Sequence, residues 1–132
     1  TKVGGKTMKV QALLAVACGG MIGALARYGV DGLLAGTTFA LQATLLVNVI
    51  GAFGLGYMTP KQWANRDGWY TCLTTGFFGS FTTFSTVYLQ WFEWFTYGLV
   101  KEVFIYGTAM LGCGFVAAGI GYYASKWKEK ER

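Results

Sequence analysis

Two polar side chains lie deep in a stretch of sequence, positions 32 to 60, that contains no charged residue. Thr44 and Asn48 are four positions apart, so a helix would place them on the same face, one turn from each other. The Asn amide can donate two hydrogen bonds and accept two, and burying it without partners would cost roughly 2–7 kcal/mol on transfer scales. Two interpretations are open: Asn48 donates to a ligand, or it bonds a neighbouring helix.

A second group of polar residues follows two glycines, Gly76 and Gly79. The sequence from Thr74 reads Thr-Thr-Gly-Phe-Phe-Gly-Ser-Phe-Thr-Thr-Phe-Ser-Thr. Glycine, serine and β-branched threonine all disfavour a continuous helix, so we predict a break near residues 79–83. A break frees carbonyls that suit a cation and amides that suit an anion. The alternative is a kink packed entirely against protein.

These polar groups must be positioned by four apolar segments. No charged residue occurs in positions 10–26, 32–60, 68–92 or 103–125, and a helix needs about 20 apolar residues to cross a bilayer. The sequence therefore predicts an all-α integral membrane protein with four transmembrane helices, at about 9–30, 39–59, 68–98 and 101–125. The membrane domain would cover 9–127, between a tail at 1–8, either native or left by expression, and a basic tail at 128–132.

The ends of these segments carry basic and aromatic residues. Nine of the eleven Lys and Arg residues would lie on one side with both termini, which favours a cytoplasmic location for that side. Arg27 lies at the inner end of the first segment, where it would attract anions. Trp91 and Trp94 belong to the aromatics expected at the membrane interface, and Tyr106 is either another of these or a residue of a polar site.

Glycine is unusually frequent, with 20 residues in a chain of 132. Pairs such as Gly19 and Gly23, or Gly114 and Ala118, place small residues on one helix face and allow close helix packing. Packing within one subunit explains most of them. Four short helices enclose little volume, so we expect a homo-oligomer.

Several classes of protein are excluded by what the sequence lacks. It contains no histidine, and its three cysteines are isolated within apolar stretches, so neither a catalytic constellation nor a metal cluster can be assembled. We therefore expect that this protein is not an enzyme. The net charge of +5 has no basic face or RNA-reading motif with it, so we expect no nucleic-acid partner.

Three motifs together resemble the Fluc (CrcB) fluoride channel family. They are Gly19-Gly20-x2-Gly23-Ala24-x2-Arg27-Tyr28, Asn48-Val49-x-Gly51, and Gly79-x2-Thr82-Thr83-Phe84-Ser85-Thr86. The resemblance extends over essentially the whole chain. It implies a passive fluoride channel in the bacterial inner (plasma) membrane, built as a multi-pass, antiparallel, dual-topology homodimer with two pores and a central structural sodium ion.

The resemblance also implies roles for individual residues. Arg27 would lie in a vestibule, and the carbonyls of Gly79 and Thr82 would bind sodium. The pore would be lined by Asn48, Phe84, Thr44, Tyr106, Ser85 and Thr86. Val87 stands where the family usually has a second phenylalanine, and the bias of basic residues to one side is unlike a dual topology.

Uncharged donors suit fluoride, because a pore must replace its tightly held water without binding it too strongly for release. The rival interpretation is a small proton-coupled multidrug exporter, which would need a carboxylate inside a segment; none is present. A structural accessory subunit, a third possibility, would need neither Asn48 nor a helix break.

Overall fold

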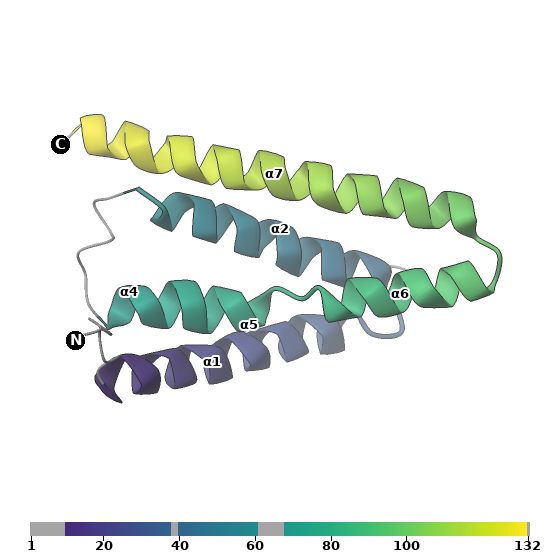
Figure 1. Ribbon diagram of the computed structural model, residues 1–132, viewed down its shortest axis with the longest axis horizontal. Helices are drawn as coiled ribbons and strands as arrows, with labels where there is room; N and C mark the ends of the chain where they lie inside the picture. The colour runs from purple at the N-terminus through teal and green to yellow at the C-terminus, as the bar shows by residue number, and fades with distance from the viewer. Residues whose placement is uncertain (1–9, 38–39, 61–67, 132) are drawn as a thin grey trace, which may run out of the picture.

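The computed structural model describes residues 10–37, 40–60 and 68–131, and every regular element in these ranges is helical. The helices form four segments that alternate in direction, and each of these segments is called a pass below (Figure 1). The elements are α1 (Val10–Leu34), α2 (Ala40–Met58), α4 (Trp69–Thr71), the π-helix η1 (Cys72–Phe78), α5 (Gly79–Phe81), α6 (Ser85–Thr96) and α7 (Val100–Lys130). Residues 1–8, predicted as a tail, lie outside the described residues, whereas residues 128–130 of the predicted basic tail continue α7.

The third pass is made of four of these elements. Its first half contains the π-helix η1, which the sequence did not predict, and its helical backbone ends at Phe81. Thr82 is extended, with φ −75° and ψ 156°, and the helix resumes at Ser85. The interruption therefore lies at residues 82–84 and overlaps the predicted range of 79–83 at Thr82 and Thr83, whereas residues 79–81 are helical. Ser80 does not break the helix because its hydroxyl lies 2.8 Å from both the Gly76 and the Gly20 carbonyl oxygens, where it can donate to either.

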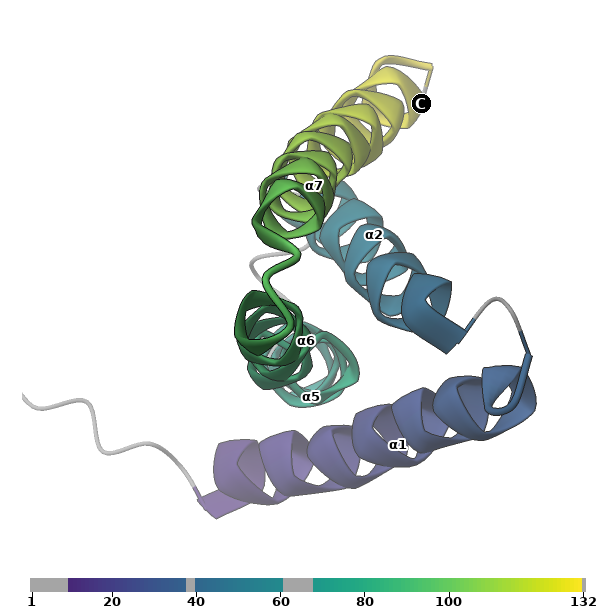
Figure 2. The same cartoon turned by 90° about the vertical axis from the view of Figure 1, so that its right-hand side faces the viewer.

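Glycines let the passes approach closely in two pairs. Figure 2 shows α7 against α2, and α1 against the third pass. A methyl group at Gly56 or Gly121 would collide with the carbonyl oxygen of Ala118 or Phe53, and one at Gly19 with that of Cys72. The predicted packing of small residues is therefore observed within one chain at these positions.

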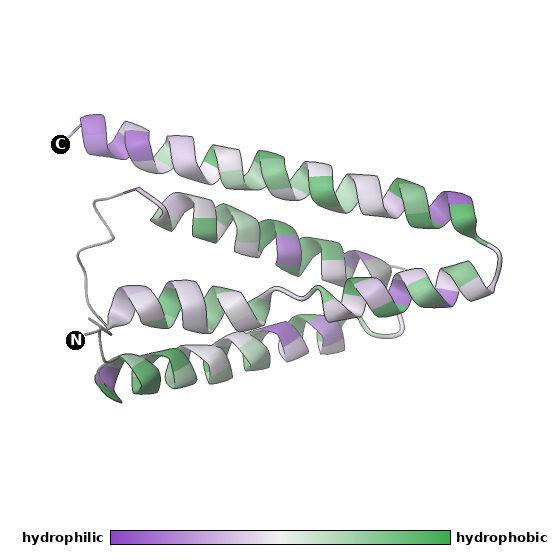
Figure 3. Cartoon of the chain, viewed as in Figure 1, coloured by the Kyte–Doolittle hydropathy of each residue, from purple (hydrophilic) through white to green (hydrophobic). Residues whose placement is uncertain are grey.

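Most of the apolar surface is not buried. The buried hydrophobic residues of the described chain are few, whereas many large apolar residues of α1 and α7 are exposed. Figure 3 shows apolar residues along most of both helices. These two helices are long and apolar enough to cross a bilayer, and α2 is a shorter apolar helix. A water-soluble chain rarely exposes so much contiguous apolar surface, so the fold is that of a protein embedded in lipid.

Candidate functional site

Asn48 of α2 is bound to the backbone at the helix break. Its Nδ2 donates to the Thr83 carbonyl oxygen at 2.9 Å, and its Oδ1 accepts from the Thr83 amide at 2.8 Å. A second Nδ2 contact reaches Met110 Sδ of α7 at 3.6 Å. The interhelical bonding foreseen for Asn48 as one of two alternatives is therefore present. It also leaves one amide hydrogen with only a thioether, a weak acceptor.

The Thr83 hydroxyl bonds the first turn of α6, which forms the second half of the broken pass. It accepts from the Thr86 amide at 3.2 Å, the bond that a capping side chain makes to the first turn of a helix. The same oxygen lies 3.2 Å from the Ser85 hydroxyl and 3.0 Å from the Thr86 hydroxyl. Thr83 is buried, so three adjacent hydroxyls gather where α6 begins.

These bonds divert two amides from their helical partners. In a continuous helix the amides of Thr83 and Thr86 would pair with the carbonyls of Gly79 and Thr82. Here the first donates to Asn48 and the second to the Thr83 hydroxyl. Arg27 of α1, half-buried rather than at an outer end, approaches the Thr82 carbonyl oxygen with its guanidinium at 3.4 Å.

A second polar cluster lies one turn before Asn48 on α2. Thr44, 2% exposed, accepts from Gln90 Nε2 of α6 at 3.0 Å and is hydrogen-bonded to the Tyr106 side chain of α7. The Tyr106 ring also packs edge-on against Trp94, with ring centroids 5.2 Å apart. Tyr106 therefore contacts both a residue of this polar cluster and an expected interfacial aromatic, so its role in a polar site stays a prediction.

A cavity of about 260 Å³ joins the helix break to α6 and α7. Among its lining residues, Asn48, Thr82, Thr83 and Trp91 carry side-chain hydrogen-bonding groups, and none has a charged side chain. Phe84, whose side chain is 73% exposed, lies on the same wall. The lining is Asn48, Thr82, Thr83, Phe84, Val87, Trp91, Gly107, Met110 and Leu111.

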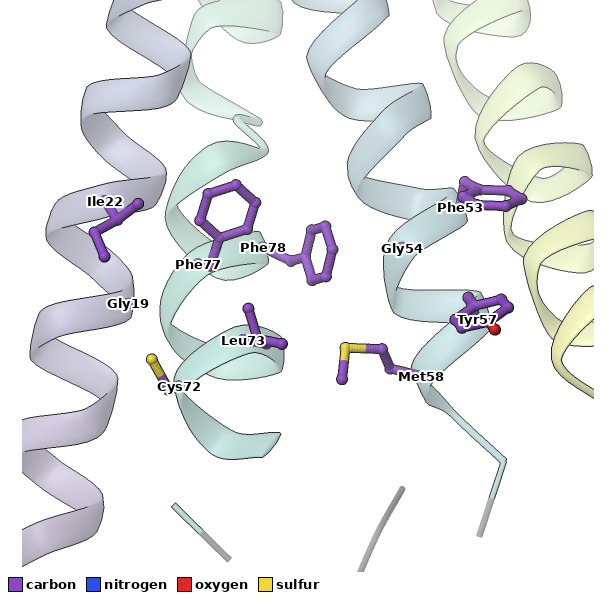
Figure 4. A pocket seen from close by; sticks show the side chains of 10 residues that line it. All are labelled: Gly19, Ile22, Phe53, Gly54, Tyr57, Met58, Cys72, Leu73, Phe77 and Phe78. Atoms are coloured by element: carbon purple, nitrogen blue, oxygen red, sulfur yellow. The ribbon is translucent and has the colours of Figure 1, made fainter. Parts of the chain in front are cut away.

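A larger cavity, of about 380 Å³, lies between α2 and the first half of the third pass, bordered also by α1 (Figure 4). Its walls are almost entirely apolar, and the side chains of Leu73, Phe78 and Met58 lie between α2 and the third pass. A small, tightly hydrated ion would lose its water there without finding donors. The polar cavity beside the break is therefore the better candidate site.

The structure brings the predicted residues into two neighbouring clusters. Asn48, Ser85 and Thr86 meet around Thr83, and Phe84 shares the cavity wall with Asn48. Thr44 and Tyr106 meet at Gln90, one turn along α2. Arg27, predicted in a vestibule, lies with its guanidinium 3.4 Å from the Thr82 carbonyl oxygen at the break, and its role in a vestibule stays a prediction.

Sequence reasoning missed three residues of this region. Thr83 was grouped with other hydroxyls, although its position in the break is decisive. Gln90 was not considered, although an amide near the end of a charge-free segment was a usable signal. Trp91 was assigned to the interfacial aromatics, yet it lines the cavity. The buried Gln90 Oε1 and Trp91 Nε1 have no hydrogen-bond partner in the described chain.

The exposed apolar helices and the buried, uncharged polar clusters define an integral membrane protein with an internal polar site. Comparison with known proteins identifies its family. Residues 14–122 match the model of the family described as CrcB-like protein, Camphor Resistance (CrcB). The chain belongs to this family, which confirms the resemblance carried by its motifs.

Several relatives are similar over most of their length. A protein of Geobacillus kaustophilus named fluoride-specific ion channel FluC 2 is 38% identical over 125 residues, 89% of this chain and 95% of the relative. A protein of the same name from Bacillus cereus strain ATCC 10987 is 37% identical, covering 85% and 94%. A fluoride-specific ion channel FluC of Oceanobacillus iheyensis is 33% identical, covering 82% and 88%.

Proposed function

We propose that this protein is a fluoride-selective ion channel that lets fluoride leave the cell passively. The names of its relatives support this function. The single structural observation that carries it is the pair of uncharged polar side chains on α2, Thr44 and Asn48, which bond residues of the third pass and of α7.

Asn48 can serve the pore and the fold together. One hydrogen of its amide holds the Thr83 carbonyl, and the other faces the sulfur of Met110 at 3.6 Å. Fluoride in the neighbouring cavity is a far stronger acceptor than a thioether, so it would take this second hydrogen. The positive edge of the Phe84 ring and the hydroxyls of Thr44, Tyr106, Ser85 and Thr86 would complete the uncharged pathway.

Arg27 would contribute a positive potential instead of a binding site within the pore. Its guanidinium is half-buried beside the break, and a cation there raises the local concentration of anions. A fixed cation in the narrowest part would bind fluoride too tightly for release, whereas the donors of the pathway are neutral.

A proton-coupled exporter is not favoured by the family to which the chain belongs. The polar clusters agree, since no carboxylate is present among the described residues that line the cavity beside the break. Membership of a family whose relatives are named as channels also agrees with the expectation that this protein is no enzyme.

The assembly that we propose is an antiparallel, dual-topology homodimer with two pores in the bacterial inner membrane, each chain crossing it four times. Support comes from Phe84, which is 73% exposed on the wall of an open cavity, so one chain leaves the pathway incomplete. Cysteine accessibility from both sides of the membrane, measured at one introduced terminal cysteine in cells, tests the dual topology.

We also propose a structural sodium ion held by the carbonyls of Gly79 and Thr82 from each subunit. The fit rests on the backbone: these are two of the carbonyls that lose their helical donors at the break, because the amides of Thr83 and Thr86 bond Asn48 and the Thr83 hydroxyl instead. Carbonyl oxygens are the ligands that alkali cations accept. When bound, the ion would supply a fixed positive charge, and Arg27 would share the Thr82 carbonyl with it.

Ion efflux from liposomes tests the proposed function. Liposomes that contain purified protein should release fluoride rapidly and chloride hardly at all. Proton-driven uptake of an organic cation without fluoride flux would contradict the proposal.

A further inference from the structure

The last turns of α7 extend beyond the apolar part of the helix. Positions 103–125 carry no charged residue, and a helix of this length spans about 34 Å, close to the roughly 30 Å of the hydrocarbon core of a bilayer. The helix is apolar enough to cross a membrane and continues to Lys130. Lys126 and the residues after it therefore reach the level of the lipid headgroups, and Figure 3 shows that this end of α7 is hydrophilic.

Basic and aromatic side chains share one face of this end. Lys126 and Lys130 are four positions apart, as are Tyr123 and Trp127, so the members of each pair are neighbours one turn apart. Each lysine also lies three positions after one of the aromatic residues, which makes the two pairs adjacent rows. Tyr123 is 72% and Trp127 70% exposed, and both lysines are exposed. These four residues are called the α7 end face below.

Two contacts orient the charged groups around this face. Lys126 Nζ lies 5.1 Å from the centroid of the Tyr122 ring, a distance at which a cation and an aromatic face attract each other. Trp127 Nε1 donates a hydrogen bond to Glu131 Oε1 at 2.8 Å. The first contact supports the ammonium group beside the face, and the second engages a carboxylate oxygen with an indole instead of a lysine.

Acids near the α7 end face reduce its positive charge but do not cancel it. Lysines at positions 126, 128 and 130 stand against two acids, at 129 and 131, and Glu129 interacts electrostatically with Lys126. The negative end of the helix dipole favours lysines in the last turn, which accounts for Lys128 and Lys130. The dipole does not account for Lys126, which lies one turn earlier, or for the exposed aromatic row beside it.

The composition of the face indicates the chemistry of a partner. A lysine ammonium group only donates hydrogen bonds, and phosphate oxygens accept strong, charge-assisted ones. Tyr and Trp are enriched where a membrane meets water, with their rings at the level of the headgroups. Basic residues at the same level attract anionic lipids. An anionic phospholipid combines these properties at the depth that the length of α7 gives to the face.

We propose that the α7 end face binds the headgroup of an anionic phospholipid, with the ammonium groups of Lys126 and Lys130 on its phosphate oxygens. This inference goes beyond the proposed function and does not depend on fluoride conduction. Charge complementarity selects the lipid: a zwitterionic headgroup carries a cation that balances its own phosphate, whereas an anionic headgroup leaves a net charge for the lysines. In the proposed antiparallel dimer, one such face lies in each leaflet.

Native mass spectrometry of full-length protein, purified in detergent and freed of lipid, tests this proposal. Phosphatidylglycerol and phosphatidylcholine are titrated separately, and we expect the wild type to retain phosphatidylglycerol preferentially. The double variant Lys126→Gln/Lys130→Gln should bind phosphatidylglycerol about thirtyfold more weakly, the effect of two lysines near an anionic surface. Its weak binding of phosphatidylcholine should be unchanged.

The matched control is Lys101→Gln/Lys128→Gln, which removes the same charge from exposed lysines elsewhere on α7. Lys101 lies at the other end of the helix, and Lys128 is two positions from each lysine of the face, about 200° around the helix. This variant should bind phosphatidylglycerol as wild type does. Equal losses in both double variants would indicate attraction to net charge alone and would overturn the proposal, as would a wild type that binds both lipids equally.

A second measurement uses the wild-type protein only. The protein is crosslinked in liposomes to a phosphatidylglycerol with a photoreactive headgroup, and peptide mapping identifies the modified residues. We expect modification within residues 122–130 that excess unlabelled phosphatidylglycerol suppresses and phosphatidylcholine does not. Modification confined to other parts of the chain, or suppressed equally by both lipids, would overturn the proposal even if the double variants did not assemble.

Discussion

The side-chain amide of Asn48 pairs with both backbone groups of Thr83, donating at 2.9 Å and accepting at 2.8 Å. A residue of one helix thus satisfies the backbone where another helix is interrupted. Unpaired backbone groups are costly in lipid, so this pairing allows the break to exist within the membrane. It also fixes the wall of the polar cavity.

Asn48→Asp should reduce fluoride efflux about a hundredfold. The carboxylate still accepts from the Thr83 amide but opposes its carbonyl, and it replaces the donor that faces the cavity by a negative charge. A loss of about 3 kcal/mol corresponds to this factor. Efflux is measured from liposomes, after gel filtration has shown that the variant assembles like wild type.

The matched control for this variant is Gln11→Glu, the same amide-to-acid change on an exposed residue of α1. It should conduct normally. If Asn48→Asp assembles and conducts as well as the control, Asn48 acts only as a bond between helices and its proposed pore role is wrong.

Thr83→Val should destabilise the protein by about 1 kcal/mol. It keeps the shape of the side chain but removes the oxygen that accepts from the Thr86 amide at 3.2 Å. Thermal unfolding in detergent measures the effect. Thr108→Val is the control, because Thr108 is exposed and its hydroxyl bonds only the Phe104 carbonyl of its own helix; an equal loss in both variants would contradict the capping role.

Gly121→Ala should destabilise the chain by roughly 1–3 kcal/mol, since the added methyl group collides with the Phe53 carbonyl oxygen of α2. Gly119→Ala, on the same helix with open space around its Cα, should be neutral or stabilise by up to about 1 kcal/mol. Thermal unfolding curves of the two variants measure the change in stability that each substitution causes. The reverse order would mean that α2 and α7 do not pack as described.

Arg27→Ala should lower fluoride flux mainly at low salt and low fluoride. At 0.1 M, salt largely screens the attraction between a cation and an anion more than about 10 Å away, so flux at high salt should approach that of wild type. Flux is compared over a range of ionic strength. Lost discrimination against chloride with unchanged fluoride flux would place Arg27 in the selective part of the pore instead.

The sequence located much of this site because polar residues are conspicuous in apolar segments. Asn48 and the hydroxyl-rich stretch were identified in this way, and the break was predicted within a few residues. The exact position was not predictable, since Thr83 is held by Asn48 from another helix and Ser80 finds carbonyls that keep its turn helical. The π-helix η1 has no local signal in the sequence.

Trp91 shows the other limit of sequence reasoning. Its position among aromatics at a segment end is typical of the membrane interface. Only the packing of α6 on α7 reveals that its ring lies against Gly107 and lines a polar cavity. The position of α6 beside α2 likewise brings Gln90 to Thr44, a contact that no spacing along the chain indicates.

The central claim is that this protein conducts fluoride through a pathway of uncharged donors. Its most direct test compares the efflux of fluoride and chloride from liposomes loaded with each potassium salt, after valinomycin opens a path for potassium. We predict fast fluoride release, little chloride release, and no dependence on a proton gradient. Equal release of both anions, or fluoride release only when a proton gradient drives it, would contradict the claim.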